Sequence, residues 1–530
     1  MKKVKVLDCT LRDGGYVNNW HFGNNNIKVI IDKLNQSKID IIECGFLRDD
    51  VAETGGDYSI FRTFQEGIKL YSNFFLSDRQ YALMMLAEKY DISHLCDKNQ
   101  SSINTIRLSF HKRDISKAIE MSKIIIEKGY KLFLQPTATM RYSDDEIKEL
   151  IRLCNDEIQP DSLAIVDTFG EMNAKDIVHY TKLFDESLNK NITLSFHSHN
   201  NLQTAFSNAI LFIDHVETDR EIVVDSSVYG MGRGAGNLCT ELILNYLNKN
   251  FKKNYDLFPI LEIVDNILND IKKNNYWGYS LEYYLSAINH CHPNYCIYFS
   301  NLKTLTTYDL QNILSLISEE KRMDFDKEYA VGLYQGYNSK KYLDKKYYTN
   351  LKKQIENKSV ILIGPGKSIL DESLKIKNYI NNKEKYYSIS INANSIFDVD
   401  AVFISNRRRY EEFKYNSDTR CLVTSNINTK IKNAMIFDYY DNLAREFSVS
   451  DNALLMILNI LKKSGVSEIL LAGFDGFSIE RDNNYYTDEL TYIIDKNRIK
   501  ELNNVLKKYI KKYKEELNIK FLTSSKYEEN

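Results

Sequence analysis

Residues 4–15 have the sequence VKVLDCTLRDGG, in which a short apolar run passes directly into a charged loop that ends in two glycines. The run Val4–Cys9 predicts a buried β-strand, and Arg12 and Asp13 follow its carboxyl end. Further runs of this kind recur at intervals of roughly 30 residues through the first half of the chain. They are Ile39–Phe46, Tyr81–Leu86, Ile103–Phe110, Lys131–Pro136, Ser162–Thr168, Ile192–His197 and Ile222–Val228.

Segments with helical periodicity separate these strands; examples are Ile27–Gln36, Ile115–Lys128, Asp144–Asn155 and Leu202–Ile213. Strands that alternate with helices predict parallel βαβ units, and eight such units predict a closed (β/α)8 TIM barrel rather than an open sheet. The predicted fold class is therefore α/β. Catalytic residues of such barrels lie at the carboxyl ends of the strands and in the loops that follow them.

The composition is typical of a soluble globular protein with more than one domain. The chain has 530 residues, of which 43% are hydrophobic and 27% charged. A net charge of -2 gives no general attraction to nucleic acid, and no stretch approaches the ~20 apolar residues of a membrane span. The N-terminus shows no secretory signal, and the eight cysteines contain no CxxC pair, so we expect reduced thiols in a cytoplasmic protein.

Two histidines at the end of the seventh strand are the strongest candidates for a metal site. His197 and His199 are two positions apart, so their side chains point to the same face, which at a barrel mouth is the interior. Asp13, after the first strand, can complete a mixed nitrogen and oxygen ligand set. The alternatives are a surface or core pair of histidines and a structural Arg12–Asp13 ion pair. The segment Gly234–Asn237 after the eighth strand favours the metal site.

These motifs together resemble a known family. Leu7–Gly14, Phe196–Asn200 and Gly234–Asn237 are similar to the signatures of the DRE-TIM metallolyase superfamily, and the resemblance covers roughly residues 1–300. That group includes 4-hydroxy-2-oxovalerate aldolase, hydroxymethylglutaryl-CoA lyase and the isopropylmalate and homocitrate synthases. The segment Ile165–Gly170 makes the aldolases the most similar members.

The resemblance implies a function and a set of site residues. Asp13, His197 and His199 would bind a divalent metal such as Mn2+, Mg2+, Co2+ or Zn2+, with Asn237 as ligand or neighbour. Arg12 would neutralise the oxygen of an enolate formed from a 2-oxo acid such as pyruvate, which would react with an aldehyde. The expected activity is that of a carbon–carbon lyase or aldolase. Candidate substrate contacts at other strand ends are Asp167, Thr168 and His111.

The sequence departs from the aldolases at one position. Those enzymes carry an acid/base histidine shortly after the RDG motif, where this chain has Tyr16, and the nearest histidine here is His21. Tyr16, His21, Glu43 and His111 are all at or near strand ends, and each could equally be a hydrogen-bonding or packing residue. The proton-transfer residue therefore stays open.

The residues after the barrel divide into two further predicted parts. We expect a catalytic domain over 1–250, a helical extension over 251–350 that serves as a lid or dimer contact, and a Rossmann-like domain over 351–530. Helical periodicity in the extension covers Leu257–Lys272, Leu281–Asn289 and Tyr308–Ile317. His290 and His292 precede Pro293, and packing or lid residues are favoured over a second metal site.

The last part predicts an open parallel sheet. Its expected strands are Val360–Ile363, Tyr387–Ile391, Ala401–Ile404, Arg420–Thr424 and Glu468–Ala472. The loop after the first of these matches neither the Walker A nor the GxGxxG pattern, but it is similar to glycine-rich loops of sialyltransferase-like and pterin-pyrophosphokinase-like domains. A nucleotide or nucleotide-sugar site is one hypothesis, and a structural domain without a ligand is the other. The candidate residues are Gly364, Gly366, Lys367, Ser368 and Asp475.

Three functions compete on these grounds. The leading one is an aldolase or lyase for a 2-oxo acid and an aldehyde. For this function we expect a homo-oligomer, and a role in polysaccharide biosynthesis is one hypothesis. The second is a Claisen-type acyltransferase that uses acetyl-CoA, because such enzymes share the same kind of metal site. The third is a bifunctional glycan-assembly protein whose C-terminal domain resembles a glycosyltransferase.

Overall fold

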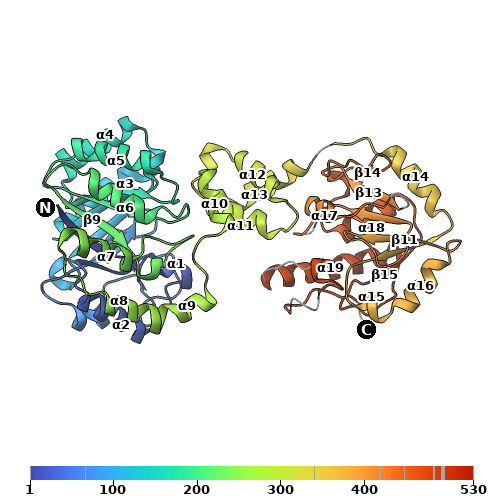
Figure 1. The fold of residues 1–530 in the computed structure, drawn as a ribbon, viewed down its shortest axis with the longest axis horizontal. Coiled ribbons are helices and arrows are strands. Elements are labelled where there is room, and N and C mark those ends of the chain that lie inside the picture. The colour runs from blue at the N-terminus through green and yellow to red at the C-terminus, as the bar shows by residue number, and fades with distance from the viewer. Residues whose placement is uncertain are drawn as a thin grey trace. The chain divides into compact units, whose positions relative to one another are not determined.

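The structure is a computed structural model that forms two compact units, Met1–Pro293 and Asn294–Asn530 (Figure 1). It describes residues 2–65, 67–339, 341–416, 419–446, 448–480, 484–490 and 496–528. The predicted division at residues 250 and 350 stays a prediction. Among the described residues, no helix has the length and apolar character needed to cross a membrane.

The first unit is a closed barrel of eight parallel strands, which confirms the fold predicted from the sequence. Around the ring they are β1 (Lys3–Asp8), β2 (Ile41–Leu47), β4 (Gln80–Leu86), β5 (Thr105–Phe110), β6 (Lys131–Pro136), β7 (Ser162–Asp167), β8 (Thr193–Ser198) and β9 (Glu221–Ser226). β9 pairs with β1 and β1 with β2, which closes the ring. The two-residue β3 (Ile60–Phe61) is an additional neighbour of β2.

The first unit also contains helices, most of which bury apolar residues against the barrel. They are α1 (Gly15–Asn18), α2 (Asn24–Gln36), α3 (Ile115–Glu127), α4 (Asp144–Leu153), α5 (Ala174–Ser187), α6 (Ala205–His215), α7 (Thr240–Phe251), α8 (Phe258–Ile263), α9 (Asn269–Asn274) and α10 (Leu281–Ile288). At the start of α4, the side chain of Ser143 accepts from the backbone N–H of Glu146, and the Glu146 side chain accepts from the backbone N–H of Ser143. This capping box fixes where the helix begins.

The alternation of side chains along each strand gives the barrel two different cores. Outward residues such as Val6 and Phe196 pack against the helices. Inward residues form a small apolar layer that contains Leu7, Ile41 and Phe133. The interior toward the carboxyl ends of the strands is occupied by charged side chains, and the candidate site is built there.

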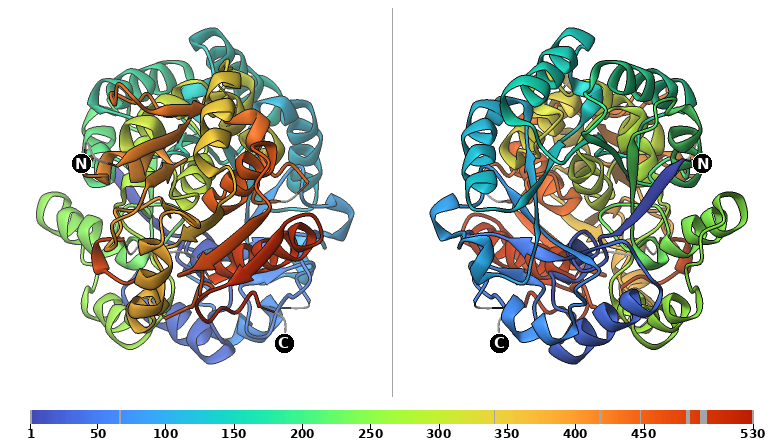
Figure 2. Two further views of the ribbon diagram at one scale, coloured as in Figure 1. Left: turned by 90° about the vertical axis from the view of Figure 1, so that its right-hand side faces the viewer. Right: turned by 90° about the vertical axis from the view of Figure 1, so that its left-hand side faces the viewer.

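The second unit contains an open sheet of parallel strands with helices on both faces (Figure 2). The strand order is β14 (Met435–Phe437), β13 (Arg420–Thr424), β12 (Ala401–Ile404), β11 (Tyr386–Ile391), β10 (Ser359–Ile363), β15 (Glu468–Ala472) and β16 (Asn518–Phe521). The helices are α11 (Pro293–Asn301), α12 (Thr307–Ser315), α13 (Lys327–Asn338), α14 (Lys345–Ile355), α15 (Ser368–Asp371), α16 (Ser373–Asn381), α17 (Arg407–Glu412), α18 (Ala453–Lys463) and α19 (Lys496–Lys514). The predicted parallel sheet is confirmed, and it includes two short strands, β14 and β16, that the sequence did not predict.

Candidate active site

The two histidines and Asp13 meet inside the mouth of the barrel. His197 lies in β8 and His199 directly follows it, whereas Asp13 lies in the loop after β1. Asp13 Oδ2 is 3.2 Å from Nε2 of His197 and 3.9 Å from Nε2 of His199. All three side chains are buried. Only β9 separates β1 from β8 in the closed sheet, which is why residues so distant in sequence converge.

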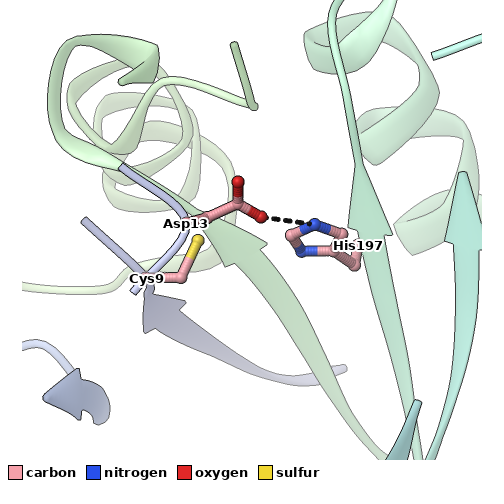
Figure 3. Close-up of side chains that lie close together, drawn as sticks. All are labelled: Cys9, Asp13 and His197. Carbon is pink, nitrogen blue, oxygen red and sulfur yellow. Dashed lines mark ion pairs between the residues drawn. The ribbon is translucent and has the colours of Figure 1, made fainter. Parts of the chain in front are cut away.

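Cys9 lies beside Asp13 and His197 (Figure 3). One ligand atom from each of these three residues lies within 4.8 Å of the others, close enough to hold one metal ion. Burial raises the pKa of the Cys9 thiol well above its usual value, and the thiol donates to the carbonyl oxygen of Ser226 at 3.1 Å. A thiol that stays protonated is a poor ligand, so the carboxylate and the imidazoles are the better candidates.

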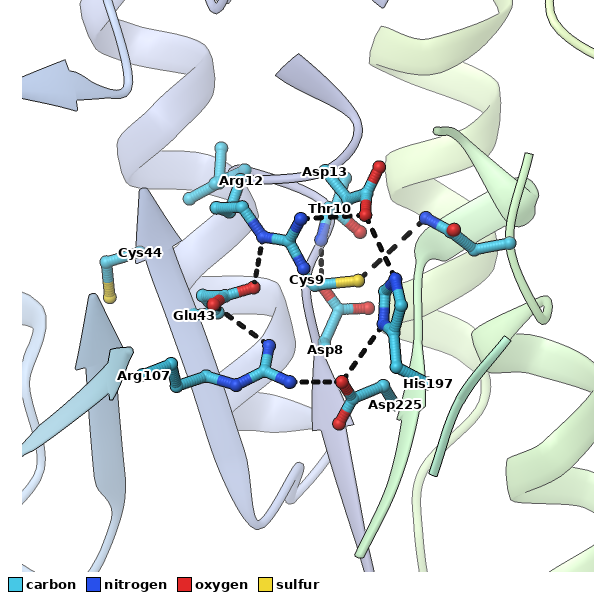
Figure 4. Close-up of polar contacts among 12 residues, drawn as sticks. Asp8, Cys9, Thr10, Arg12, Asp13, Glu43, Cys44, Arg107, His197 and Asp225 are labelled. Atoms are coloured by element: carbon cyan, nitrogen blue, oxygen red, sulfur yellow. Dashed lines mark hydrogen bonds and ion pairs between the residues drawn. The ribbon is translucent and has the colours of Figure 1, made fainter. Parts of the chain in front are cut away.

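Asp13 is also part of a closed ring of six buried side chains (Figure 4). Arg12 donates to Asp13 through Nη1 and to Glu43 through Nε, each at 2.8 Å. The other carboxylate oxygen of Glu43 lies 2.9 Å from Nη1 of Arg107. Carboxylates and guanidinium groups therefore alternate, and each buried charge has opposite charges beside it.

Asp225 and His197 complete this ring. Arg107 forms an ion pair with Asp225, and the same Asp225 oxygen lies 3.0 Å from Nδ1 of His197. In the neutral imidazole, Nδ1 donates its proton to Asp225, so the lone pair of Nε2 faces Asp13. A histidine whose second nitrogen is held by a carboxylate is a characteristic arrangement for a metal ligand.

The titration of these groups favours a cation between them. Burial lowers the pKa of His199 to about 4, so this imidazole is neutral near pH 7. Burial also acts to lower the pKa of His197, but the carboxylates of Asp13 and Asp225 raise it above its usual 6.5. Arg12 and His199 hold the pKa of Asp13 well below its usual value despite burial. A metal ion would take the place of a proton on His197, and with both imidazoles then neutral the ring carries three negative and two positive charges.

Asn237 brings a further oxygen to the same place. Its backbone bridges to that of His199, and its Nδ2 donates to the carbonyl oxygen of Met231 at 3.3 Å. Oδ1 of Asn237 is buried and has no hydrogen-bond partner among the described residues. A buried polar atom without a partner costs about 1–3 kcal/mol, and a cation beside it would offset that cost. One carboxylate, two imidazoles and an amide oxygen fit a divalent metal.

Three of the four candidates for proton transfer are engaged elsewhere. Glu43 is fully buried between two guanidinium groups. His21 is exposed, with its ring 4.8 Å from that of Tyr58. His111, also a candidate substrate contact, places Nε2 3.2 Å from a carboxylate oxygen of Glu88.

Tyr16, the fourth candidate, lies next to the charged ring. Its ring packs at 4.7 Å from that of Trp20, and the guanidinium carbon of Arg233 lies 5.9 Å from its centre. Burial raises the pKa of Tyr16, against the opposing effect of Arg233 and Arg12. The phenol therefore keeps its proton at neutral pH, close to Asp13 and Arg12.

Asp167 and Thr168 use their side chains to hold the loops at the barrel mouth. The carboxylate of Asp167 accepts from the backbone of Glu171 at 2.9 Å and of Met172 at 3.2 Å. The hydroxyl of Thr168 accepts from the backbone of Ala138 at 2.7 Å. The structure thus gives both residues a role in loop geometry, and their contact with a substrate stays a prediction.

Arg107 and Asp225 are members of the charged ring that the sequence analysis did not identify. Both are buried charged residues within strands, and each is next to a residue that points outward, Leu108 or Val224. The same parity places His197 inside the barrel. A charged residue at an inward position of a predicted strand was the available signal.

His290 and His292 contact the loops around the mouth. Nδ1 of His290 lies 2.6 Å from a carboxylate oxygen of Glu171. Nε2 of His292 is in hydrogen-bond contact with Arg233. The backbone N–H of Arg233 in turn points to Asp13 Oδ1 at 3.4 Å. The segment therefore packs against the site, consistent with packing or lid residues.

The candidate nucleotide residues lie at the carboxyl ends of β10 and β15. A Cβ on Gly364 or on Gly366 would meet the carbonyl oxygen of Gly473 at 2.6 Å or 2.5 Å, so close packing of two loops requires both glycines. The carboxylate of Asp475 accepts from the backbone and hydroxyl of Ser368. Lys367 is exposed. Their role in nucleotide binding stays a prediction.

Removing the charge of Asp225 should weaken metal binding. Asp225→Asn keeps the size of the side chain but loses the anion that orients His197, and such changes typically cost about 10–100-fold in metal affinity. The measurement is titration of the purified full chain with Mn2+. Asp185→Asn is the matched control, because Asp185 is a buried carboxylate paired with Arg220 outside the ring. Equal losses in both variants would contradict the assignment.

A (β/α)8 barrel with a buried cluster of acidic and histidine side chains at the carboxyl ends of its strands defines a class of protein suited to metal-assisted chemistry. The HMGL-like family model matches residues 3–267, and the chain belongs to this family. The resemblance to the DRE-TIM group is thereby confirmed.

Individual relatives are distant. 4-Hydroxy-2-oxovalerate aldolase from Geobacillus genomosp. 3 is 22% identical over 271 residues, which cover 51% of this chain and 77% of that protein. Homocitrate synthase from Pyrococcus horikoshii is 27% identical over 263 residues, or 49% and 69% of the two chains. The crystal structure of the N-terminal domain of a presumed aldolase from Bacteroides vulgatus is 28% identical, with a TM-score of 0.49 over 56% of this chain and 96% of that one.

Proposed function

We propose that the barrel is a divalent-metal-dependent aldolase, which makes or breaks a carbon–carbon bond next to the carbonyl of a 2-oxo acid such as pyruvate, with an aldehyde as partner. The observation that carries this proposal is the convergence of Asp13, His197 and His199 beside the buried guanidinium of Arg12. The names of the aldolase relatives agree with it. A dication bound there supplies positive charge to the carboxylate and ketone oxygens of the substrate.

Arg12 provides a fixed positive charge for the reaction. Its guanidinium is held by Asp13 and Glu43, so it cannot turn away from the mouth of the barrel. When the bond next to the ketone breaks, negative charge moves onto the ketone oxygen of the 2-oxo acid. A preorganised guanidinium stabilises that charge without any rearrangement at the moment of reaction.

Tyr16 is the group that we assign to proton transfer. Cleavage of the 4-hydroxy substrate requires removal of the hydroxyl proton, and return of a proton to the methyl carbon of pyruvate. The phenol of Tyr16 stays protonated and lies at the edge of the charged ring, whereas Glu43 is enclosed within it. Tyr16 can therefore deliver its phenol proton to the methyl carbon of the enolate, and the proton released from the substrate hydroxyl, passed through water, restores the phenol.

Tyr16→Phe should slow the reaction by about 100-fold, at the lower end of the range for general acid–base catalysis, since water can partly replace the phenol. The measurement is kcat for aldehyde release with saturating Mn2+. Tyr58→Phe is the control, because Tyr58 contacts His21 and an exposed carboxylate instead of the ring. An unchanged kcat in Tyr16→Phe would remove the assignment.

The proposed function is tested most directly by hydrogen exchange. The full chain with Mn2+ should exchange the C3 protons of pyruvate with deuterium from the solvent, seen by NMR, and should then condense pyruvate with one of a panel of aldehydes. The homocitrate synthase similarity favours one rival, an acyltransferase that uses acetyl-CoA. Release of free CoA from acetyl-CoA and a 2-oxo acid, with no aldehyde condensation, would establish the rival and overturn the aldolase proposal.

The wider setting also belongs to this proposal. We expect the enzyme to be a cytoplasmic homo-oligomer, and a role in polysaccharide biosynthesis would follow if the second unit binds a sugar nucleotide. Size-exclusion chromatography with light scattering tests the oligomeric state.

A further inference from the structure

The second unit contains a cavity of about 200 Å³ at the carboxyl ends of β10, β11, β12 and β15. Its apolar wall includes Leu302, Ile391, Val449, Leu454, Phe474 and Phe477. Polar and charged side chains line the remainder, among them Ser405, Asn452 and Tyr485. The proposed barrel chemistry uses none of these residues.

The strand order places this cavity where open parallel sheets bind ligands. From β10 the chain adds β11 to β14 on one side, then returns to place β15 and β16 on the other. β10 and β15 are therefore the neighbouring strands at which the strand order reverses, and the cavity lies at their carboxyl ends, where the loops that follow them pack together through Gly366 and Gly473. Such a switch point, outside the carboxyl ends of the strands, is the general position of a ligand site in this architecture.

Two independent features at the cavity point to a ligand with polar groups. Ser405 is 4% exposed, and its hydroxyl has no hydrogen-bond partner among the described residues. The amino end of α18 also faces the cavity through Asn452, Ala453 and Leu454. That helix has 11 residues and is capped by Asn452, which accepts from the backbone N–H of Leu454, so it offers the cavity the positive end of its dipole.

The charged side chains at the cavity favour an anion. Arg409 is buried and lies 5.6 Å from the centre of the Tyr485 ring, and Arg498 lines the same cavity. Each arginine also forms an ion pair, with Glu412 and Glu501 respectively, neither of which lines the cavity. Two carboxylates are also present, but both are hydrogen-bonded within the protein. Asp451 accepts from the hydroxyl of Tyr334 at 2.7 Å, and Asp475 accepts from Ser368.

The same contacts argue against the glycine-rich loop as the anion site. Asp475 already accepts from the backbone N–H of Ser368, where an anion on that loop would bind. Neither Gly364, Lys367 nor Ser368 lines the cavity, whereas Gly366 and Asp475 do. A ligand would therefore lie beside this loop, toward α18 and the two arginines.

We propose that this cavity binds a nucleotide, with its planar base against the apolar wall and Tyr485, and its phosphate groups toward Arg409, Arg498 and the amino end of α18. An aromatic ring and a guanidinium side by side suit a ligand that has both a base and a phosphate. The unpaired hydroxyl of Ser405 would then hydrogen-bond to the nucleotide. This binding function is separate from the chemistry proposed for the barrel.

The test is calorimetric titration of the full chain with UDP, CMP, ADP and GDP, and with inorganic phosphate and uridine as partial ligands. At least one nucleotide should bind more tightly than roughly 1 mM, and more tightly than either partial ligand. Arg409→Gln and Arg498→Gln should each weaken binding by about tenfold or more, and Ser405→Ala by about threefold. Arg408→Gln is the matched control, since Arg408 lies in α17 next to Arg409 but does not line the cavity.

The results of these experiments test the nucleotide site independently of the aldolase activity proposed for the barrel. Exchange of the pyruvate protons should be unchanged in all four variants, so a failure of the aldolase proposal leaves the nucleotide result standing. If Arg409→Gln does not fold, Arg498→Gln, on the half-buried start of α19, decides the question. The proposal is overturned if no nucleotide binds, if phosphate alone binds as tightly, or if folded arginine variants bind like the unchanged protein.

Discussion

His199→Ala is expected to abolish both divalent-metal binding and turnover in the full chain. The variant removes one of the two buried imidazoles that face Asp13. Metal sites with three protein ligands lose most of their affinity when one ligand is deleted, and the chemistry depends on the cation. Metal content per chain, measured by mass spectrometry after dialysis, and the rate of pyruvate exchange should both fall to background.

A second histidine variant separates this effect from general damage. His215→Ala removes an exposed imidazole on α6 whose Nδ1 donates to the carbonyl oxygen of Leu211 in the same helix. Its metal content and rate should match those of the unchanged protein. If His199→Ala retained one tightly bound metal per chain, the ligand set assigned to Asp13, His197 and His199 would be wrong.

The barrel could be predicted because each of its strands is a separate apolar run in the sequence. Strands buried on both faces are apolar runs, and helices with polar outer faces separate them. The predicted ends differ from the observed ones by two residues or fewer, as for Ile39–Phe46 against β2 and Ile222–Val228 against β9. The position of Asp13 near His197 then follows from the closure of the ring.

The rest of the charged ring could not be derived in the same way. Glu43, Arg107 and Asp225 form contacts between different strands, and a single sequence gives no partner for an isolated charge. The same limit applies to the second sheet. β14 has three residues and β16 alternates with lysine and asparagine, so neither has the apolar run by which the other strands were recognised.

Asp475 illustrates a different limit. Its contact with a nucleotide was predicted from its position after β15 and stays a prediction; the structure adds that the residue lines the cavity and that its carboxylate accepts from Ser368. A sequence indicates which groups reach the end of a strand, but it does not indicate whether another group of the same loop already satisfies them. Only the positions of both loops decide between a ligand contact and an internal hydrogen bond.

Arg12→Ala is expected to lower kcat by between about 100-fold and 1,000-fold while the metal stays bound, as measured for loss of one preorganised group that stabilises developing negative charge. Asp13 keeps its contact with His197, and Glu43 keeps its ion pair with Arg107, so the remaining ring can still hold a cation. The metal content should therefore stay near one per chain, in contrast to His199→Ala. Arg12→Lys should restore part of the rate, because it returns the charge without the two-sided contact.

Arg220→Ala is the matched control for the cost of removing a buried arginine. Arg220 lies just before β9, at the opposite end of the strand from the site, and is held by Asp185 and by backbone carbonyl oxygens. This variant should unfold at a lower temperature but keep its kcat in the folded fraction. In Arg12→Ala we expect kcat to fall far more than in Arg220→Ala. The reason is that charge stabilisation during the reaction does not depend on how much the side chain stabilises the fold. A loss of bound metal together with the loss of rate in Arg12→Ala would instead make Arg12 a structural partner of Asp13, and the fixed charge would have to come from Arg233, whose backbone also contacts Asp13.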